Sequence, residues 1–287
     1  MLNKSIQYII APPPPHFVGD GFRVHNFFPG AIQGGMQRTD PFLLMDYGAP
    51  HYFPPSDQPR GVGVHPHRGF ETVTIAYKGS VAHRDSAGNG GIINPGDVQW
   101  MTAASGVLHE EFHEEEFTKK GGEMQMVQLW VNLPAKDKMS KPGYQAITND
   151  SIPRFKEKDI EIEIIAGTYK GIGGSAKTHT DVHMYNVSMQ AGSKAEFEFP
   201  SHFTTCLLVI EGDISIDNKT VPTHHFVLFS NDEEQCSFQA INNAKVLLLA
   251  GEPIQEPIAA HGPFVMNTRE EIMQAFMDFQ EGKFGSM

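Results

Sequence analysis

The sequence predicts an all-β protein of antiparallel strands with a short α-helix near the C-terminus. Short runs of alternating residues recur along the chain, such as Val73, Ile75 and Tyr77 separated by polar or small residues, and this alternation is typical of half-buried strands. Turn residues separate the runs, since the chain contains 28 Gly and 20 Pro, with clusters such as NPGD at 94–97. No regular helical pattern lies between the strands, which favours antiparallel over parallel sheets.

The one clear helical pattern begins after Asn267. Thr268 and Glu271 form a capping-box pattern, and Gly282 is a natural stop. Apolar residues between them keep helical spacing: Ile272, Ala275, Phe276 and Phe279. We interpret this stripe as a packing face.

A faint internal repeat predicts two β-domains of similar plan. Residues 74–85 (TIAYKGSVAHRD) resemble residues 207–218 (LLVIEGDISIDN). Residues 126–134 resemble residues 244–253 in the same way, and these offsets are far longer than a solenoid period.

The boundary between the two domains is expected in the polar stretch 134–150, which has the composition of a linker. We therefore expect an N-terminal domain over residues 1–142 and a C-terminal domain over residues 143–287, the latter ending in the helix.

Composition excludes several classes of function. The net charge of −12 over 287 residues argues against direct binding to nucleic acid. No run of 18 apolar residues occurs, so we expect no membrane association, and the first 17 residues do not resemble a secretory signal. Cys206 and Cys236 both lie in apolar segments and are expected to be buried thiols. We expect a monomer in the cytoplasm, with the nucleus as an alternative in a eukaryote.

Two pairs of polar residues could form a metal site. His65 and His67 are two residues apart, so on a strand they face the same side. His109 and Glu111 form a second pair of the same kind, and an antiparallel barrel can bring both pairs to one point. His113 shares the face of the second pair, and spacing alone leaves open that it replaces His109 or Glu111.

Three imidazoles and one carboxylate suit a first-row divalent transition metal, and the lack of clustered cysteines argues against a structural zinc site. Four protein ligands around an octahedral ion would leave two positions open for water, oxygen or substrate. Residue types alone do not choose among iron, nickel, cobalt, manganese, copper and zinc.

Long strings of this sequence resemble the pirin family of the cupin superfamily. They are HPHRGFETV (65–73), NPGDVQWMTAASGVLHEE (94–111), LWVNLP (129–134) and HGPFVMN (261–267). The resemblance runs from about residue 20 to residue 281 and implies a bicupin, two antiparallel jelly-roll barrels facing each other.

The resemblance also implies the ligands. The family's metal-binding histidines and glutamate fall on His65, His67, His109 and Glu111, which removes His113 from the set. Glu71 occupies the acidic position of the general cupin motif, and we expect it to support the site rather than bind the metal.

Two functions follow from the resemblance. Some pirins resemble quercetin 2,3-dioxygenases. On this interpretation the chain would bind iron(II) and act on a flavonol-like aromatic substrate and O2, and Glu111 would also be the catalytic base. Other pirins are iron-dependent regulators. On that interpretation the chain would bind a protein partner, such as a transcription factor or a metabolic enzyme, and would have no physiological catalytic activity.

The second domain is expected to bind no metal, so that each chain binds one ion. Counting back from the matched glycines Gly79 and Gly212 places Glu198 and Pro200 at the positions of His65 and His67. Proline offers no side-chain donor, and residues 231–240 contain no histidine.

Overall fold

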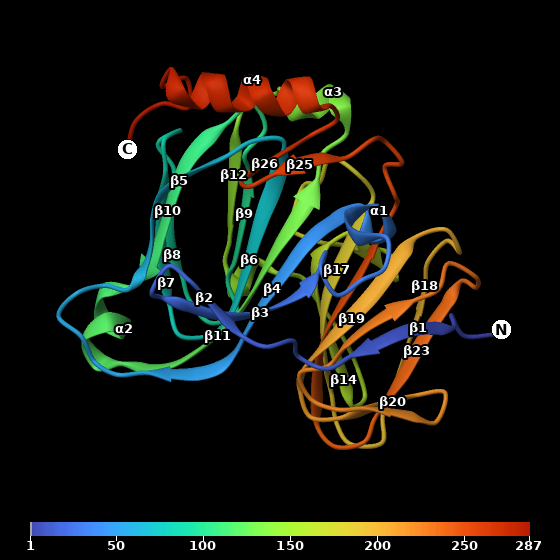
Figure 1. Cartoon of the computed structure of the whole chain (residues 1–287). Helices are drawn as coiled ribbons and strands as arrows, with labels where there is room; N and C mark the ends of the chain where they lie inside the picture. The colour runs from blue at the N-terminus through green and yellow to red at the C-terminus, as the bar shows by residue number, and fades with distance from the viewer. Residues whose placement is uncertain (1) are drawn as a thin grey trace. The chain divides into compact units, whose positions relative to one another are not determined.

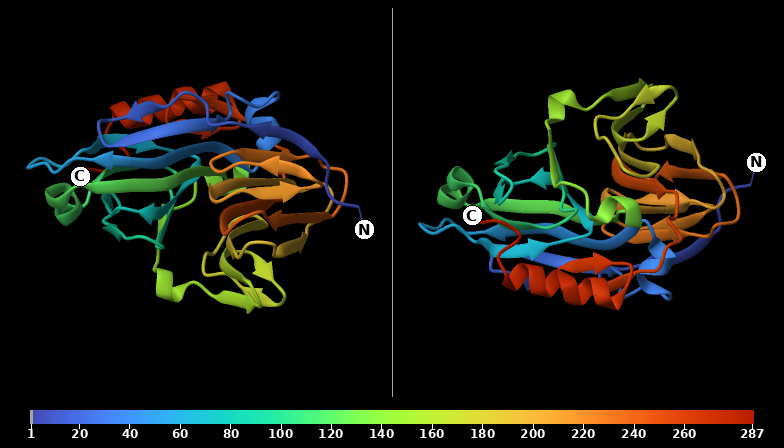
Figure 2. Two further views of the ribbon diagram at one scale, coloured as in Figure 1. Left: turned by 90° about the horizontal axis from the view of Figure 1, so that it is seen from below. Right: turned by 90° about the horizontal axis from the view of Figure 1, so that it is seen from above.

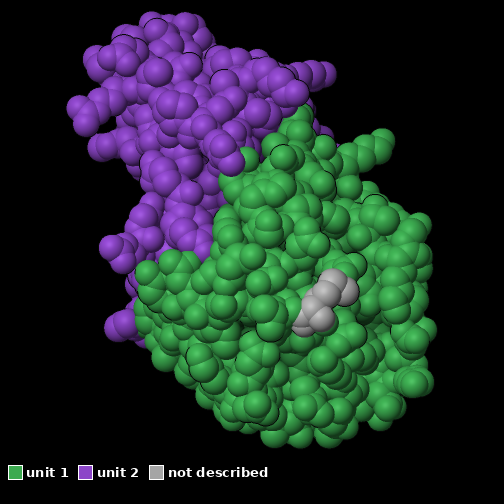
Figure 3. Space-filling model, turned by 90° about the vertical axis from the view of Figure 1, so that its right-hand side faces the viewer, with its two compact units in different colours: residues 1–13, 150–253 green, residues 14–149, 254–287 purple. Residues whose placement is uncertain are grey.

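The fold is mostly antiparallel β-structure, as the sequence predicts. A computed structural model describes residues 2–287 and divides the chain into two compact units (Figures 1 and 3). Unit 1 combines the segment ending at Pro13 with residues 150–253, and unit 2 combines residues 14–149 with residues 254–287. Each unit contains a seven-stranded, a four-stranded and a two-stranded sheet.

Unit 2 contains the first half of the chain. Its seven-stranded sheet has the order β12 (Gly143–Ile147), β9 (Val98–Thr102), β6 (Phe70–Lys78), β11 (Gly122–Asn132), β4 (Phe42–Phe53), β3 (Phe22–Phe28), β2 (His16–Val18). Its four-stranded sheet has the order β5 (Gly61–His67), β10 (Val107–His113), β7 (Val81–Asp85), β8 (Gly90–Ile93). The rest of the unit comprises β25 (Ala259–His261), β26 (Phe264–Met266), α1 (Gly35–Thr39), α2 (Glu115–Lys120), α3 (Ala135–Lys138) and α4 (Arg269–Gln280).

Unit 1 has the same plan. Its seven-stranded sheet has the order β1 (Ile6–Ile10), β22 (Phe226–Phe229), β19 (Thr204–Glu211), β24 (Ala244–Gly251), β17 (Val182–Met189), β14 (Ile160–Ala166), β13 (Arg154–Glu157). Its four-stranded sheet has the order β18 (Lys194–Glu198), β23 (Gln235–Ala240), β20 (Ile214–Ile216), β21 (Lys219–Val221). The hairpin β15 (Thr168–Tyr169) and β16 (Ile172–Gly173) completes the unit, and the 3-10 turn η1 (Asn149–Ser151) lies where the chain passes from unit 2 to unit 1.

The internal repeat corresponds to this shared strand order. β6 and β19 occupy the third place of their seven-stranded sheets, and β11 and β24 occupy the fourth. The matched glycines Gly79 and Gly212 follow β6 and β19 with φ of 76° and 68°, a left-handed conformation that favours glycine in both tight turns.

The compact units do not follow the expected division at residue 142, because each end of the chain belongs to the unit that the opposite half of the chain mainly forms. β1 pairs with β22 and so belongs to the unit formed by the second half of the chain. β12, at 143–147, pairs with β9 and extends unit 2 to Asn149. The predicted linker therefore contains a helix and a strand rather than an open connection.

The C-terminal helix forms as predicted but packs in unit 2, which is built mainly from the first half of the chain. Thr268 and Glu271 make both hydrogen bonds of a capping box at the start of α4. Its Ile272 and Ala275 are buried together with Phe264 and Phe284. In Figures 1 and 2 the red α4 lies beside β25 and β26. No helix within residues 2–287 is long and apolar enough to cross a membrane.

Candidate metal centre

Two neighbouring strands of unit 2 position the predicted ligands. β5 carries His65 and His67, and β10 carries His109 and Glu111. The strands pair antiparallel with His109 directly opposite His65. Because alternate residues of a strand point to the same side, the three imidazoles meet on one face of the four-stranded sheet.

The three imidazoles form a compact cluster that suits a metal ion. One ring nitrogen from each of His65, His67 and His109 lies within 4.8 Å of the other two. The ring centroids are 4.7 Å apart for His65 and His67 and 5.5 Å apart for His65 and His109. His67 and His109 are 6% and 1% exposed, whereas His65 is half-buried and forms the open side of the cluster.

The hydrogen bonding of the rings fits this interpretation. Nδ1 of His65 contacts the Gly63 carbonyl at 2.9 Å, which leaves Nε2 free to bind an ion. Nδ1 of His67 and Nδ1 of His109 are buried without a hydrogen-bond partner among the described residues. A buried polar atom without a partner is costly, and an ion at this point would supply the missing interaction.

The protonation state of the cluster also suits a metal. Burial lowers the pKa of His67 and of His109 well below the usual value, and the neighbouring imidazoles lower both pKa values further. These rings are therefore neutral at physiological pH. Neutral imidazole is the form that binds a metal, so no proton has to be removed first.

Glu111, the predicted fourth ligand, is not part of the three-histidine group and has a partner of its own. Its buried carboxylate accepts hydrogen bonds from Nε2 of Gln128 at 3.0 and 3.1 Å. Glu111 is two residues beyond His109 on β10 and lies opposite His83 of β7. The amide of Gln128 fixes the orientation of this carboxylate.

A second set of polar residues supports His109. Nε2 of Gln99 lies 3.1 Å from Nδ1 of His83 and 3.4 Å from Nε2 of His109. The hydroxyl of Tyr144 lies 2.9 Å from Nε2 of His83. Burial lowers the pKa of His83, although the carboxylates of Glu111 and Asp85 oppose this shift.

Sequence reasoning assigned no role at the site to Gln99, Gln128, Tyr144 or His83. A signal was available for Gln99, which follows Val98 and precedes Trp100 and Met101, with all four buried. The contacts of the two glutamines with His109 and Glu111, however, come from separate strands and cannot be read from spacing.

Two other candidate residues lie outside the cluster. Nε2 of His113 contacts the Gly21 carbonyl at 2.7 Å, and the His113 ring packs edge-on against Phe53 with centroids 4.6 Å apart. Glu71 is buried on β6 and accepts a hydrogen bond from Thr102 at 2.7 Å. Neither residue belongs to the three-histidine group.

The corresponding place in unit 1 contains apolar residues. β18 and β23 hold the places in their sheet that β5 and β10 hold in unit 2. Phe197 lies opposite Cys236 in this pair of strands. The count from the glycines placed Glu198 and Pro200 at the ligand positions, and both of these residues are exposed. The inward-facing residues are Phe197 and Phe199, both buried.

Comparison with known proteins is consistent with this geometry. The chain matches the pirin family over residues 21–131 and the pirin C-terminal cupin domain over residues 184–285. It is 48% identical over 271 residues to a Pseudomonas aeruginosa protein named as a candidate quercetin 2,3-dioxygenase, with 94% of each chain covered.

Solved structures show the same fold. The crystal structure of a quercetin 2,3-dioxygenase from Acinetobacter baumannii superimposes over 99% of both chains with a TM-score of 0.93 and 45% identity. A bacterial pirin from Escherichia coli in complex with nickel(II) is 20% identical and covers 86% of this chain and 100% of its own, with a TM-score of 0.65. Because this protein is only 20% identical, the comparison with it shows a shared fold and nothing about function.

Proposed function

The chain belongs to the pirin family, and on this premise we propose that it is a metal-dependent flavonol 2,3-dioxygenase of the quercetinase type. The observation that carries the proposal is the cluster of three convergent imidazoles with two buried, unpartnered nitrogens. The names of the Pseudomonas and Acinetobacter relatives support the substrate class.

In this proposal His65, His67 and His109 hold one divalent metal, iron(II), with Glu111 as the fourth ligand. The bound ion would supply open coordination positions and oxygen chemistry, which this donor set suits. Nickel, cobalt, manganese, copper and zinc are the alternatives that metal analysis must distinguish. The reaction opens the flavonol heterocycle, consumes O2 and releases carbon monoxide.

The chain's own contribution is to position the substrate hydroxyl and accept its proton. Glu111 is the acceptor, because a carboxylate fixed beside the imidazoles can take a proton from a hydroxyl brought to the cluster. Gln128 donates to both carboxylate oxygens, which limits their rotation. The half-buried His65 marks the side from which a flavonol would approach.

The experiment compares Glu111→Gln with Glu110→Gln. Glu110 lies on the opposite face of β10, where it pairs with Arg84, so it is a matched carboxylate outside the site. Oxygen uptake and carbon monoxide release are measured with quercetin, and each preparation is normalised to its bound metal. Glu111→Gln should lower turnover by roughly two orders of magnitude or more, the contribution of a positioned base. Glu110→Gln should leave turnover unchanged.

Equal turnover in the metal-loaded Glu111→Gln protein would remove the base role. Absence of turnover in the metal-loaded wild-type protein with quercetin would refute the dioxygenase proposal. The iron-dependent regulatory function would then take its place, with redox-dependent capture of a protein partner as its own test.

A further inference from the structure

A cavity with a volume of about 560 Å³ lies in unit 1, outside the metal centre. Binding sites for small organic molecules commonly measure about 300–1,000 Å³. Five aromatic rings line the cavity: Phe155, Tyr169, Tyr185, Phe197 and Phe199. A hollow of this size and lining is suited to a small organic ligand.

One wall of the cavity is formed by β18, the strand of unit 1 that corresponds to β5 in the shared strand order. The lining also includes Gln235, the first residue of β23. Phe197 on β18 and Phe199 directly after it are buried, so this wall offers aromatic rings instead of metal ligands.

Three of the rings are nearly parallel. The planes of Phe197 and Phe199 differ by 3°, with centroids 6.3 Å apart. Tyr185 is inclined by 21° to Phe197 and by 24° to Phe199. Offset stacking is a favoured arrangement between aromatic rings, so aligned faces favour a flat aromatic molecule over a branched aliphatic one.

The rim of the cavity alternates in charge. Lys170 pairs with Glu157 at 2.9 Å, and Lys194 pairs with Glu196 at 2.6 Å. All four side chains are at least half exposed, and Gln235 adds an amide. Because these two pairs combine two positive and two negative side chains, they do not favour a ligand of either net charge. Phenolic hydroxyls both donate and accept, so they match such a rim.

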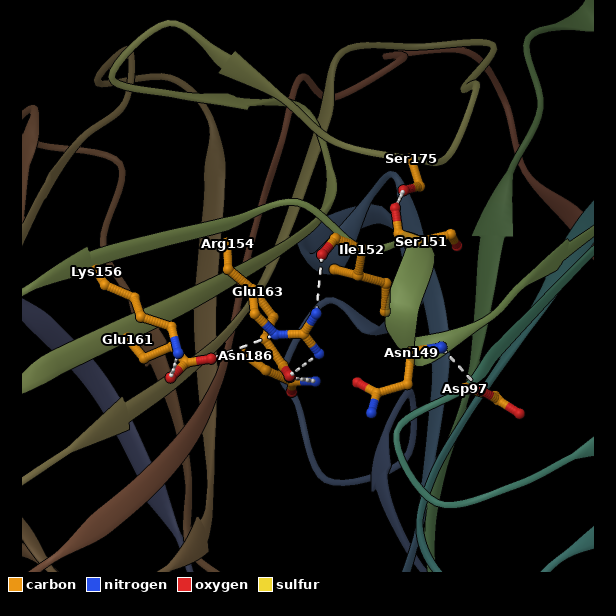
Figure 4. Close-up of polar contacts among 10 residues, drawn as sticks. All are labelled: Asp97, Asn149, Ser151, Ile152, Arg154, Lys156, Glu161, Glu163, Ser175 and Asn186. Atoms are coloured by element: carbon orange, nitrogen blue, oxygen red, sulfur yellow. Dashed lines mark hydrogen bonds and ion pairs between the residues drawn. The ribbon is translucent and has the colours of Figure 1, made fainter.

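The strand that carries Phe155 is joined to its neighbour by ion pairs as well as by backbone pairing. On β13, Arg154 pairs with Glu163 at 2.9 Å and Lys156 pairs with Glu161 at 2.9 Å (Figure 4). These residues alternate with Phe155, which lines the cavity. The contacts add to the antiparallel pairing of β13 with β14 and so fix the edge strand beside the cavity.

We propose that unit 1 contains a metal-independent binding site for a planar aromatic compound of two or three rings that carries hydroxyl groups at its edge. The nearly parallel rings of Tyr185, Phe197 and Phe199 align with the plane of the ligand, and the inclined rings of Phe155 and Tyr169 contact it edge-on. The paired lysines and glutamates of the rim bind its hydroxyls. The second cupin-type unit is then a ligand-binding module in its own right.

The probe for this site is 2,7-dihydroxynaphthalene, whose two hydroxyls are too far apart to chelate a metal. Its fluorescence is titrated with the full-length protein, with Tyr169→Ala, and with Phe17→Ala as the matched control. Tyr169 is half-buried at the cavity, whereas Phe17 is an exposed ring in unit 2. The double variant His65→Ala/His67→Ala separates this site from the metal centre.

We expect saturable binding of one molecule per chain, weakened about tenfold in Tyr169→Ala, as loss of one aromatic contact implies. Binding should be unchanged in Phe17→Ala and in the double histidine variant. If Tyr169→Ala does not fold, Ala195→Met serves instead, because Ala195 lines the cavity and a longer side chain fills it. Absence of saturable binding, full binding in the cavity variants, or loss in the histidine variant would each overturn the proposal.

Discussion

His109 and His113 are four residues apart on one strand face, and their substitution should have opposite consequences. Without its imidazole, His109→Ala leaves two clustered histidines, so the variant should lose bound metal during purification. Its effect on the stability of metal-free protein should be smaller than that of His113→Ala, because removing the buried Nδ1, which has no partner in the described structure, offsets part of the lost packing against His65, His67 and His83.

His113→Ala should keep the metal and lose stability. Removing the ring leaves the Gly21 carbonyl without its 2.7 Å contact, which costs about 1–3 kcal/mol. The ring also packs edge-on against Phe22, Phe53 and Phe117 at centroid distances of 5.7, 4.6 and 5.2 Å. Each such contact contributes about 0.5–1.5 kcal/mol, so together with the lost hydrogen bond we expect a total loss of about 5 kcal/mol. The melting temperature should fall on the order of 10–20 °C.

The assay is metal analysis of each variant purified without added metal or chelator, followed by thermal unfolding of the metal-free proteins. Comparing metal-free proteins removes the stabilisation that the ion itself provides. Stoichiometric metal in His109→Ala together with loss of metal in His113→Ala would show that the ligand assignment is wrong. Equal melting temperatures for wild type and His113→Ala would refute the packing argument.

Two predictions concern buried charges. Arg68 follows His67, is 4% exposed and contacts Asp278 of α4 at 2.8 Å, so Asp278→Ala should destabilise the protein by about 3–5 kcal/mol in thermal unfolding. Lys283→Ala, which removes an exposed partner of the same carboxylate, should have little effect, and an equal loss in both variants would contradict the assignment to Arg68. Burial lowers the pKa of Lys138 to about 8, so the folded state loses its proton before the unfolded state does. The resulting penalty is present below pH 8 and disappears as pH rises toward the ordinary lysine value. The unfolding free energy of the wild type relative to that of Lys138→Met should therefore rise between pH 8 and 10.5. A difference between the two proteins that does not change with pH would refute this prediction.

The sequence by itself determined the local features of this protein. Period-two alternation marked strands such as β6, and the capping box of Thr268 and Glu271 marked the start of α4. Two histidines at positions i and i+2 had to face one side of any strand that contained them. These features depend on residues close together in the chain, whose geometry is fixed by the backbone.

The tertiary structure decided which unit each segment joins. β1 and α4 carry no sequence signal for their partners, and each packs in the unit that the other half of the chain mainly forms. The fold also decided which side chains of β18 face the interior. Glu198, which a count along the chain placed at a ligand position, is exposed, whereas its neighbour Phe197 is buried, because adjacent side chains of a strand point to opposite faces.

The surroundings of the site likewise depended on the fold. Gln99, Gln128 and Tyr144 lie on β9, β11 and β12 and contact His109, Glu111 and His83, respectively. Each of the three residues is 34 residues or more from His65 along the chain. The aromatic cavity of unit 1 is assembled in the same way from β13, β15, β17 and β18. Contacts of this kind are fixed by pairing between distant strands, and only the folded chain brings those strands together.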